Sequence, residues 1–247
     1  YDDNKNIPPN LYSKYIQVVS QSEQTWQKAK SDNDFKTMVP YLKEIIELTK
    51  EMYSYSKPNV DTYNALLDDY EKGITANQLD TIFKELKEGT IPLIEAISKK
   101  DKVNQHIFNG HYPIHLQERL SNYFLDVINF DFKSGCLSQS EHPFTTGINS
   151  PYDVRITTNY DINDIRSSLF SVLHEGGHAI YEQNINPKLV GTRLNTGASM
   201  GIHESQSRFY ENIIGRNLSF WKKHYNKIGE ILPSYSCISL DKFYKGI

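Results

Sequence analysis

Hydrophobic residues recur at helical spacing along most of the first half of the chain. Between residues 10 and 30, one apolar stripe can be formed by Tyr15, Val18, Val19 and Trp26. Pro40 suits the first turn of a helix, and the spacing then returns in Leu42, Ile45, Ile46, Thr49 and Met52. The pattern predicts two amphipathic helices here.

Three further helices are predicted before residue 131. Residues 61–72 read as a short helix that Gly73 ends. Thr75 can cap the next helix, whose buried face is expected to hold Leu79, Ile82, Phe83 and Leu86. Pro113 opens another helix that runs to about residue 130.

The pattern changes to strict alternation near the middle of the chain. Val154, Ile156, Thr158 and Tyr160 are expected on one side of a strand, and Asp153, Arg155, Thr157 and Asn159 on the other. Helical spacing resumes from about residue 163 to 181, and a last long helix is predicted over 200–226. The fold class that follows is mainly α, with a small β-sheet.

No repeat or linker marks a domain boundary, so a single partial catalytic region over 1–247 is expected. Its parts are a helical segment (1–135), a small sheet (136–160), helices that carry the candidate site (161–226) and an end that looks truncated (227–247). The formal net charge of -3 and the mixed charges give no reason to expect nucleic acid or an acidic membrane as partner. Cys136 and Cys237 are expected as reduced thiols in a reducing compartment.

The stretch LHEGGHA, residues 173–179, carries the strongest chemical signal. His174 and His178 lie four residues apart on one helical face, where two imidazoles can hold one zinc ion. Glu175 lies beside the first imidazole and can act as a general base without binding the metal itself. Gly176 and Gly177 each cost about 1 kcal/mol relative to Ala in a helix. They are interpreted as sites of close approach by a backbone or a substrate, or simply of tight helix packing.

The third metal ligand is expected on a separate helix. Glu182 would continue along the same helix and diverge from the ion, whereas Glu204 and Glu211 lie downstream. Both remain candidates, with Glu204 slightly favoured because His203 and Gln206 beside it can hydrogen-bond the ligands. The metzincin class is excluded, since its motif would place Gly at position 181 and His at position 184, which are Tyr and Asn.

These motifs, with their neighbours, resemble the metallocarboxypeptidases typified by carboxypeptidase Taq. The resemblance is carried by HEGGHAIYEQ, SMGIHESQSRFYENIIGR, HPFTTG (from His142) and DVRITTNY, and covers essentially the whole chain. It implies a zincin-like helical fold with a small sheet beside an active-site groove. It also implies His174, His178 and Glu204 as ligands of Zn²⁺ or Co²⁺, Glu175 as the catalytic base, peptides as substrates, and a cytoplasmic homodimer.

Members of that family are longer at both ends, and two of their C-terminal signatures, IRxxAD and GxxQDxHW, have no counterpart here. The missing part is associated with the cation that binds the substrate carboxylate. The best remaining candidate in this sequence is Arg155, near Asp153 and Thr157, and the alternative is that Arg155 belongs to a solvated strand face or a structural ion pair. His142, His203, Gln206 and Arg208 are further candidates for contacts to the substrate or the ligands.

Three functions therefore stay open. The chain is expected to be a carboxypeptidase that uses metal-activated water. Alternatively, it is an inactive, metal-binding part that needs a complementing C-terminal chain, or an oligopeptidase that uses the same residues.

Overall fold

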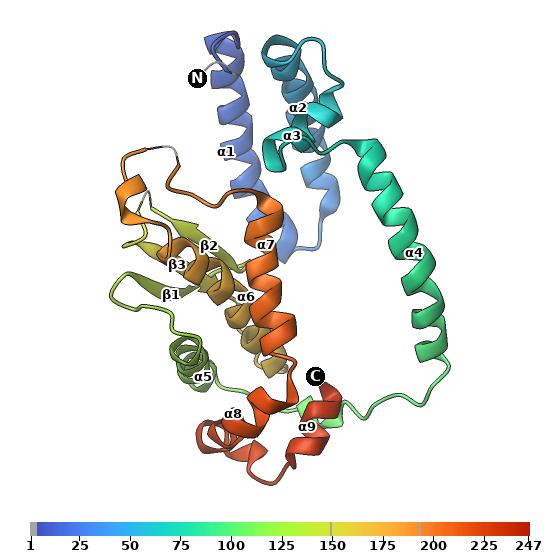
Figure 1. Cartoon of the computed structure of the whole chain (residues 1–247), viewed down its shortest axis with the longest axis vertical. Coiled ribbons are helices and arrows are strands. Elements are labelled where there is room, and N and C mark those ends of the chain that lie inside the picture. The colour runs from blue at the N-terminus through green and yellow to red at the C-terminus, as the bar shows by residue number, and fades with distance from the viewer. Residues whose placement is uncertain (1–3, 149, 193) are drawn as a thin grey trace. The chain divides into compact units, whose positions relative to one another are not determined.

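The structure is a computed structural model that describes residues 4–148, 150–192 and 194–247 (Figure 1). It divides into two compact units, Tyr1–Ile91 and Pro92–Ile247. Helices dominate both units, and a three-stranded sheet lies in the second. The prediction of a mainly α fold with a small sheet is confirmed.

The first unit is built on the packing of α1 (Pro9–Ser31) against α2 (Phe35–Ser56), whose shared core contains Leu11, Val18, Leu48 and Met52. The prediction that Pro40 lies in the first turn is wrong, because α2 begins five residues earlier. Asp34 accepts the N–H of Thr37 at 3.4 Å and so caps the helix, leaving Pro40 inside it. A proline there removes one backbone hydrogen bond, which the rest of this long helix tolerates.

The helix α3 (Thr62–Tyr70) ends before Gly73, whose φ of 81° only glycine adopts easily. Thr75 and Gln78 then form a reciprocal cap: the Gln78 N–H donates to Thr75 Oγ1 at 3.4 Å, and the Thr75 N–H donates to Gln78 Oε1 at 2.9 Å. This cap starts α4 (Ala76–Ser98), as the sequence predicts.

The prediction of a buried face on α4 is wrong. None of its residues is buried, and Ile82, Phe83 and Leu86 are 52%, 48% and 55% exposed. The apolar spacing indicated an amphipathic helix correctly, but it carried no information about what covers the apolar side. Among the described residues of the first unit, no element covers Ile82, Phe83 or Leu86.

The second unit contains the remaining helices and all three described strands. Its main elements are α5 (Ile114–Val127), β1 (Gly135–Gln139), β2 (Phe144–Gly147), β3 (Val154–Thr158), α6 (Ile165–Gln183), α7 (Met200–Arg208), a π-helical segment (Phe209–Ile214), α8 (Leu218–Ile231) and α9 (Leu240–Gly246). Short 3₁₀ turns lie at His106–Phe108, Pro187–Leu189 and Pro233–Tyr235.

The sheet has the order β1-β3-β2, with β1 parallel and β2 antiparallel to the central strand. The alternation predicted for β3 places Val154, Ile156 and Thr158 in the core, and Arg155 outside. Thr157 is an exception and is buried. Its hydroxyl accepts hydrogen bonds from the Ser140 hydroxyl and the Phe144 N–H, at 2.6 and 3.0 Å.

Helix α6 lies at the centre of the second unit and packs against α5, α7, β2 and β3. It buries ten residues, including Ile165, Leu169, Val172 and Leu173. Asp164 caps its first turn by accepting the N–H of Arg166 at 2.9 Å. The helix is therefore held on several sides, which gives any side chain on it a fixed position.

The single long helix predicted over residues 200–226 is instead interrupted. The α-helix α7 passes into the π-helical segment and ends, and α8 begins after Asn217, which accepts the Ser219 N–H at 2.8 Å. The prediction missed this break because apolar spacing alone does not distinguish one long helix from two short ones with a bulge between them.

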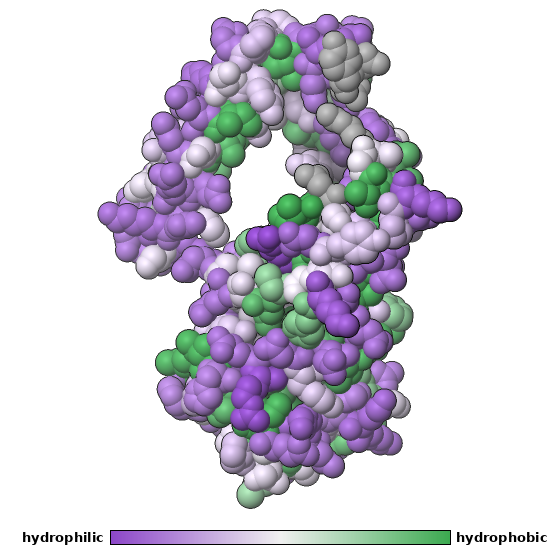
Figure 2. All heavy atoms as spheres, turned by 90° about the vertical axis from the view of Figure 1, so that its left-hand side faces the viewer, coloured by the Kyte–Doolittle hydropathy of each residue, from purple (hydrophilic) through white to green (hydrophobic). Residues whose placement is uncertain are grey.

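Hydrophobic residues on the face drawn in Figure 2 form separate patches among hydrophilic ones. None of the described helices combines the length and the apolar character that a membrane span requires. Cys136 and Cys237 are both exposed and unbridged.

Candidate metal centre

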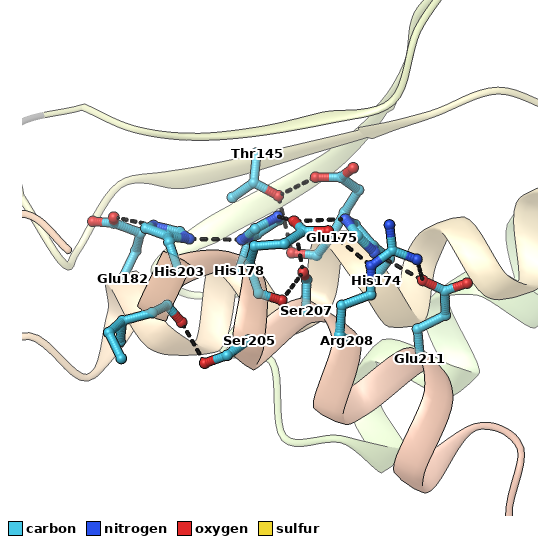
Figure 3. A network of polar contacts seen from close by, with 12 residues as sticks. Thr145, His174, Glu175, His178, Glu182, His203, Ser205, Ser207, Arg208 and Glu211 are labelled. Atoms are coloured by element: carbon cyan, nitrogen blue, oxygen red, sulfur yellow. Dashed lines mark hydrogen bonds and ion pairs between the residues drawn. The ribbon is translucent and has the colours of Figure 1, made fainter. Parts of the chain in front are cut away.

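Three side chains from two helices converge on one point. The Oε2 atom of Glu204 on α7 lies 3.6 Å from Nε2 of His174 and 3.3 Å from Nε2 of His178, both on α6. The potential ligand atoms of all three residues lie within 4.8 Å of one another (Figure 3). Both imidazoles therefore point their Nε2 atoms toward Oε2 of Glu204, and these three atoms together could hold one ion.

The two glycines of α6 explain how α7 comes so close. A Cβ atom on Gly177 would lie 2.7 Å from both the carbonyl oxygen of Gln206 and the Cα of Ser207. Such an atom on Gly176 would meet the side chains of Leu125 on α5 and of Ile128 directly after that helix, at 3.0 and 2.5 Å. Close approach by neighbouring helices thus accounts for both glycines, and the contact at Gly177 sets Glu204 opposite the imidazoles.

The environment keeps His178 neutral. Burial, with the neighbouring imidazoles of His203 and His174, lowers the pKa of His178 to about 4. At neutral pH this side chain therefore carries a free lone pair, which is the form that binds a metal.

Glu204 is ionised for a different reason. Its side chain is 45% exposed, and although partial burial opposes ionisation, hydrogen bonding from Arg208 lowers the pKa of Glu204 below its usual value. The Arg208 Nε donates to Glu204 Oε1 at 2.8 Å, and the Ser207 hydroxyl donates to Oε2 at 3.1 Å. The carboxylate is thus held in place with one oxygen toward the imidazoles.

Glu175 lies beside this group and is more deeply buried than the three candidate ligands. The residue is only 7% exposed, and burial raises the pKa of Glu175 although a hydrogen bond from Thr145 opposes the shift. The Thr145 hydroxyl lies 2.8 Å from Oε2 of Glu175 and 2.9 Å from its backbone carbonyl oxygen. Strand β2 therefore fixes one oxygen of a carboxyl group whose affinity for protons is increased.

Each imidazole also has a partner at its other nitrogen. His174 Nδ1 lies 2.9 Å from Oε2 of Glu211, which is on the π-helical segment. His178 Nδ1 lies 2.6 Å from His203 Nδ1, and His203 Nε2 lies 2.6 Å from Oε1 of Glu182. In Figure 3 these residues form a row that ends in a carboxylate on each side.

Part of this row is not predicted by the sequence. Glu211 and Glu182 were expected only as possible metal ligands, whereas the structure places both beside imidazole nitrogens that face away from Glu204. The i, i+4 spacing of Glu182 from His178 was the available signal, but the intervening His203 comes from another helix.

The other candidate residues occupy varied positions. Asp153 and Arg155 form a bidentate pair with each other, at 2.8 and 2.9 Å, and Arg208 bridges Glu204 and Glu211. Gln206 contributes its backbone carbonyl at the contact with Gly177. Thr157 belongs to the hydrogen bonding inside the sheet described above.

A cavity of about 590 Å³ adjoins the group of three. Its walls include His174 and Glu175, together with His142 from the turn before β2 and Phe170 from the preceding turn of α6. This volume is in the range of pockets that bind small ligands. A polar candidate centre and a space for a ligand thus lie side by side within the second unit.

Comparison with known proteins gives a consistent result. Residues 1–247 match the family described as carboxypeptidase Taq (M32) metallopeptidase. Carboxypeptidase 1 of Bacillus subtilis (strain 168) is 45% identical over 249 residues, which cover 100% of this chain and 50% of that protein.

Similarity to solved structures supports the same family. One described as "BsuCP Crystal Structure" has a TM-score of 0.96 at 45% identity, covering 100% of this chain and 50% of that one. One described as "Structure of Pyrococcus furiosus Carboxypeptidase Apo-Mg" has a TM-score of 0.87 at 34% identity, covering 99% and 50%.

The chain spans about half the length of the curated relatives it matches. A metallopeptidase family implies a metal cofactor, and two imidazole nitrogens with one carboxylate oxygen are a donor set suited to such an ion. The resemblance that the sequence motifs indicated is confirmed by the match over the whole chain: this protein belongs to the carboxypeptidase Taq (M32) metallopeptidase family.

Proposed function

We propose that this chain carries the metal centre of a metallocarboxypeptidase, with His174, His178 and Glu204 as the ligands of a zinc ion and Glu175 as the catalytic base. The observation that carries the proposal is the convergence of the three ligand atoms within 4.8 Å beside a buried carboxyl group. Two His and one Glu are a common ligand set in catalytic zinc sites, which keep one position open. Cobalt suits the same donors.

The hydrogen bonds around the imidazoles support this assignment. If both Nε2 atoms bind the ion, each ring carries its proton on Nδ1. His174 then donates to Glu211, and His178 donates to Nδ1 of His203, whose own proton is on Nε2 and is donated to Glu182. Every close contact in the row has one donor and one acceptor in this arrangement, so the carboxylates at the ends favour the tautomers that metal binding needs.

The bound ion would supply a Lewis acid that polarises the peptide carbonyl and makes water more acidic. The proton is transferred by a side chain of the protein itself. Glu175 accepts a proton from the attacking water and donates it to the leaving amine, a role suited to a carboxyl group whose pKa is raised. Thr145 holds Oε2 of Glu175, which leaves Oε1 for the transfer.

The test is Glu175→Gln, with Glu118→Gln on the exposed side of α5 as the matched control. We expect the first variant to bind zinc as tightly as the wild type in a competition titration and to lose at least about 100-fold in hydrolysis, the lower end for a general base. The control should retain both properties. Normal hydrolysis by Glu175→Gln would show that the mechanism is wrong.

A second candidate is a metal-binding part that is inactive alone. It is favoured by the length of the relatives, of which this chain covers 50%. We expect that adding a polypeptide equivalent to the remaining half of the Bacillus subtilis relative would increase hydrolysis by the wild-type chain and not by Glu175→Gln. Full activity without that addition would contradict this candidate. Dimer formation and a cytoplasmic location stay predictions.

The choice between an exopeptidase and an oligopeptidase depends on the end of the substrate. A carboxypeptidase needs the free carboxylate of the last residue, and an oligopeptidase does not. We therefore expect an amide at the C-terminus of the substrate to abolish hydrolysis. Equal rates on the free and amidated peptides would favour the oligopeptidase.

A further inference from the structure

The two imidazoles of the centre differ in what lies behind them. His174 Nδ1 faces a carboxylate directly, since Oε2 of Glu211 is 2.9 Å away. His178 Nδ1 faces a second imidazole, with His203 Nδ1 at 2.6 Å. An ionised carboxylate can only accept a hydrogen bond, whereas a ring nitrogen can either donate or accept. The position of the proton on His178 is therefore not fixed by His203 alone.

Glu182 supplies the missing constraint. Its Oε1 atom lies 2.6 Å from Nε2 of His203. With one proton on its ring, His203 must carry that proton on Nε2 to donate to this carboxylate, and its Nδ1 then accepts. His178 must in turn donate from Nδ1. Its Nε2 atom, which lies 3.3 Å from Oε2 of Glu204, is left with a free lone pair.

Two glycines provide the space for this chain of contacts, which Figure 3 shows as the row Glu182, His203, His178. A Cβ atom on Gly197, in the segment before α7, would lie 2.5 Å from Cδ2 of His203. A Cβ atom on Gly147, at the end of β2, would lie 3.3 Å from Oε2 of Glu182. Backbone from two separate segments therefore closes around the pair formed by Glu182 and His203.

The His203 ring is also held in its orientation. Tyr181 packs edge-on against it, with 5.1 Å between the ring centroids. The Tyr181 hydroxyl accepts the N–H of Ala198 at 3.2 Å, which ties the same ring to the segment that carries Gly197. The side chains of His203 and Glu182 are only 21% and 13% exposed. Water therefore competes little for their hydrogen bond.

From this geometry we infer that Glu182 is a positioning residue, which acts through His203 to keep His178 in the tautomer whose Nε2 can bind the ion. The inference rests on the proposed function and deepens it. Glu211 acts on His174 by direct contact, whereas Glu182 acts on His178 through an imidazole that comes from the other helix. Neither Glu182 nor His203 binds the ion itself.

The first test is Glu182→Gln, which keeps the shape of the side chain. The new amide can donate to Nε2 of His203, and the proton of His203 would then move to Nδ1 and that of His178 to Nε2, the atom needed for the metal. We expect the zinc dissociation constant, measured by competition with a chelator, to increase roughly 10- to 100-fold. Glu118→Gln, exposed on α5, is the matched control and should bind zinc like the wild type.

The second test asks whether Glu182 acts through His203 or simply through its charge. His203→Leu removes the acceptor for His178 and should also weaken zinc binding. In that background Glu182→Gln should have no further effect, because the connection is already broken. Glu211→Gln should weaken zinc binding by the same factor with and without His203, since it acts on His174. A charge effect of Glu182 would instead persist in the absence of His203.

The third test reads the tautomers directly and does not depend on a variant of His203. Long-range ¹H–¹⁵N spectra of the zinc-free chain should show the proton of His178 on Nδ1 and that of His203 on Nε2. Both protons should change nitrogens in Glu182→Gln.

Three results would overturn the inference: unchanged zinc affinity in Glu182→Gln, an equal effect of this substitution in the His203→Leu background, or wild-type His203 with its proton on Nδ1. If the wild type still binds zinc and hydrolyses peptides, only the role of Glu182 is wrong. A wild-type chain that binds no zinc would contradict the proposed function as well.

Discussion

Helices α4 and α6 have similar lengths, 23 and 19 residues, but opposite surroundings. Helix α6 buries ten residues between α5, α7 and the sheet, whereas α4 buries none. The sequence predicts an apolar face on both. The comparison shows that apolar spacing reports which side of a helix can be covered, and that the neighbours decide whether it is.

The glycines of the two helices show the same contrast. A Cβ atom on Gly177 of α6 would be 2.7 Å from the backbone of α7, whereas one on Gly89 of α4 would meet no atom within 4 Å. The first glycine permits the contact that brings Glu204 to the imidazoles. The second only lowers the stability of its helix.

The largest difference in stability between α4 and α6 variants is expected when one leucine in each helix is replaced by alanine. Leu173 is fully buried and Leu86 is 55% exposed. Leu173→Ala should lower the free energy of unfolding by about 2–5 kcal/mol through lost contacts and a cavity. Leu86→Ala should change it by less than about 1 kcal/mol. Urea denaturation of both variants measures this, and equal losses would show that α4 is covered in solution.

Of the two helices compared, zinc should stabilise α6 and leave α4 unchanged. At 100 times its dissociation constant, an ion bound to the folded form adds about 2.7 kcal/mol. Hydrogen exchange should therefore slow in α6 and α7 on addition of zinc and remain unchanged in α4. Glu204→Gln should lose the effect. Protection of α4 by zinc, or none anywhere, would contradict the proposed site.

The smallest effects, but of opposite sign, are expected from alanine at the two glycines. Gly177→Ala should destabilise the protein by about 1–3 kcal/mol, because the backbone of α7 must move. Gly89→Ala should stabilise it by up to about 1 kcal/mol, since alanine is the better helix former and has free space. Thermal unfolding of both variants checks the signs. Stabilisation by Gly177→Ala would mean that α7 is not in close contact with α6.

Local patterns predicted much of this fold. The Thr75 cap, the alternation in β3 and the spacing of His174 and His178 on α6 each depend on residues that are close in sequence. The interrupted helix after Arg208 and the hydrogen bonds of Glu182 and Glu211 with imidazoles depend on contacts between distant segments. Spacing along one helix cannot show those contacts, whereas the alternation in β3 places Asp153 and Arg155 on the same side of the strand, where they form an ion pair.

The π-helical turn at Phe209–Ile214 gives this part of the chain a particular sensitivity to changes in length. A wider turn holds one more residue than an ordinary α-helical turn. Deleting Phe209 or Tyr210 there would move Glu211 back by one position, which turns its side chain by roughly 100° around the helix axis. Such a deletion would take this carboxylate away from Nδ1 of His174, which lies 2.9 Å from it, while leaving His174 and Glu204 in place.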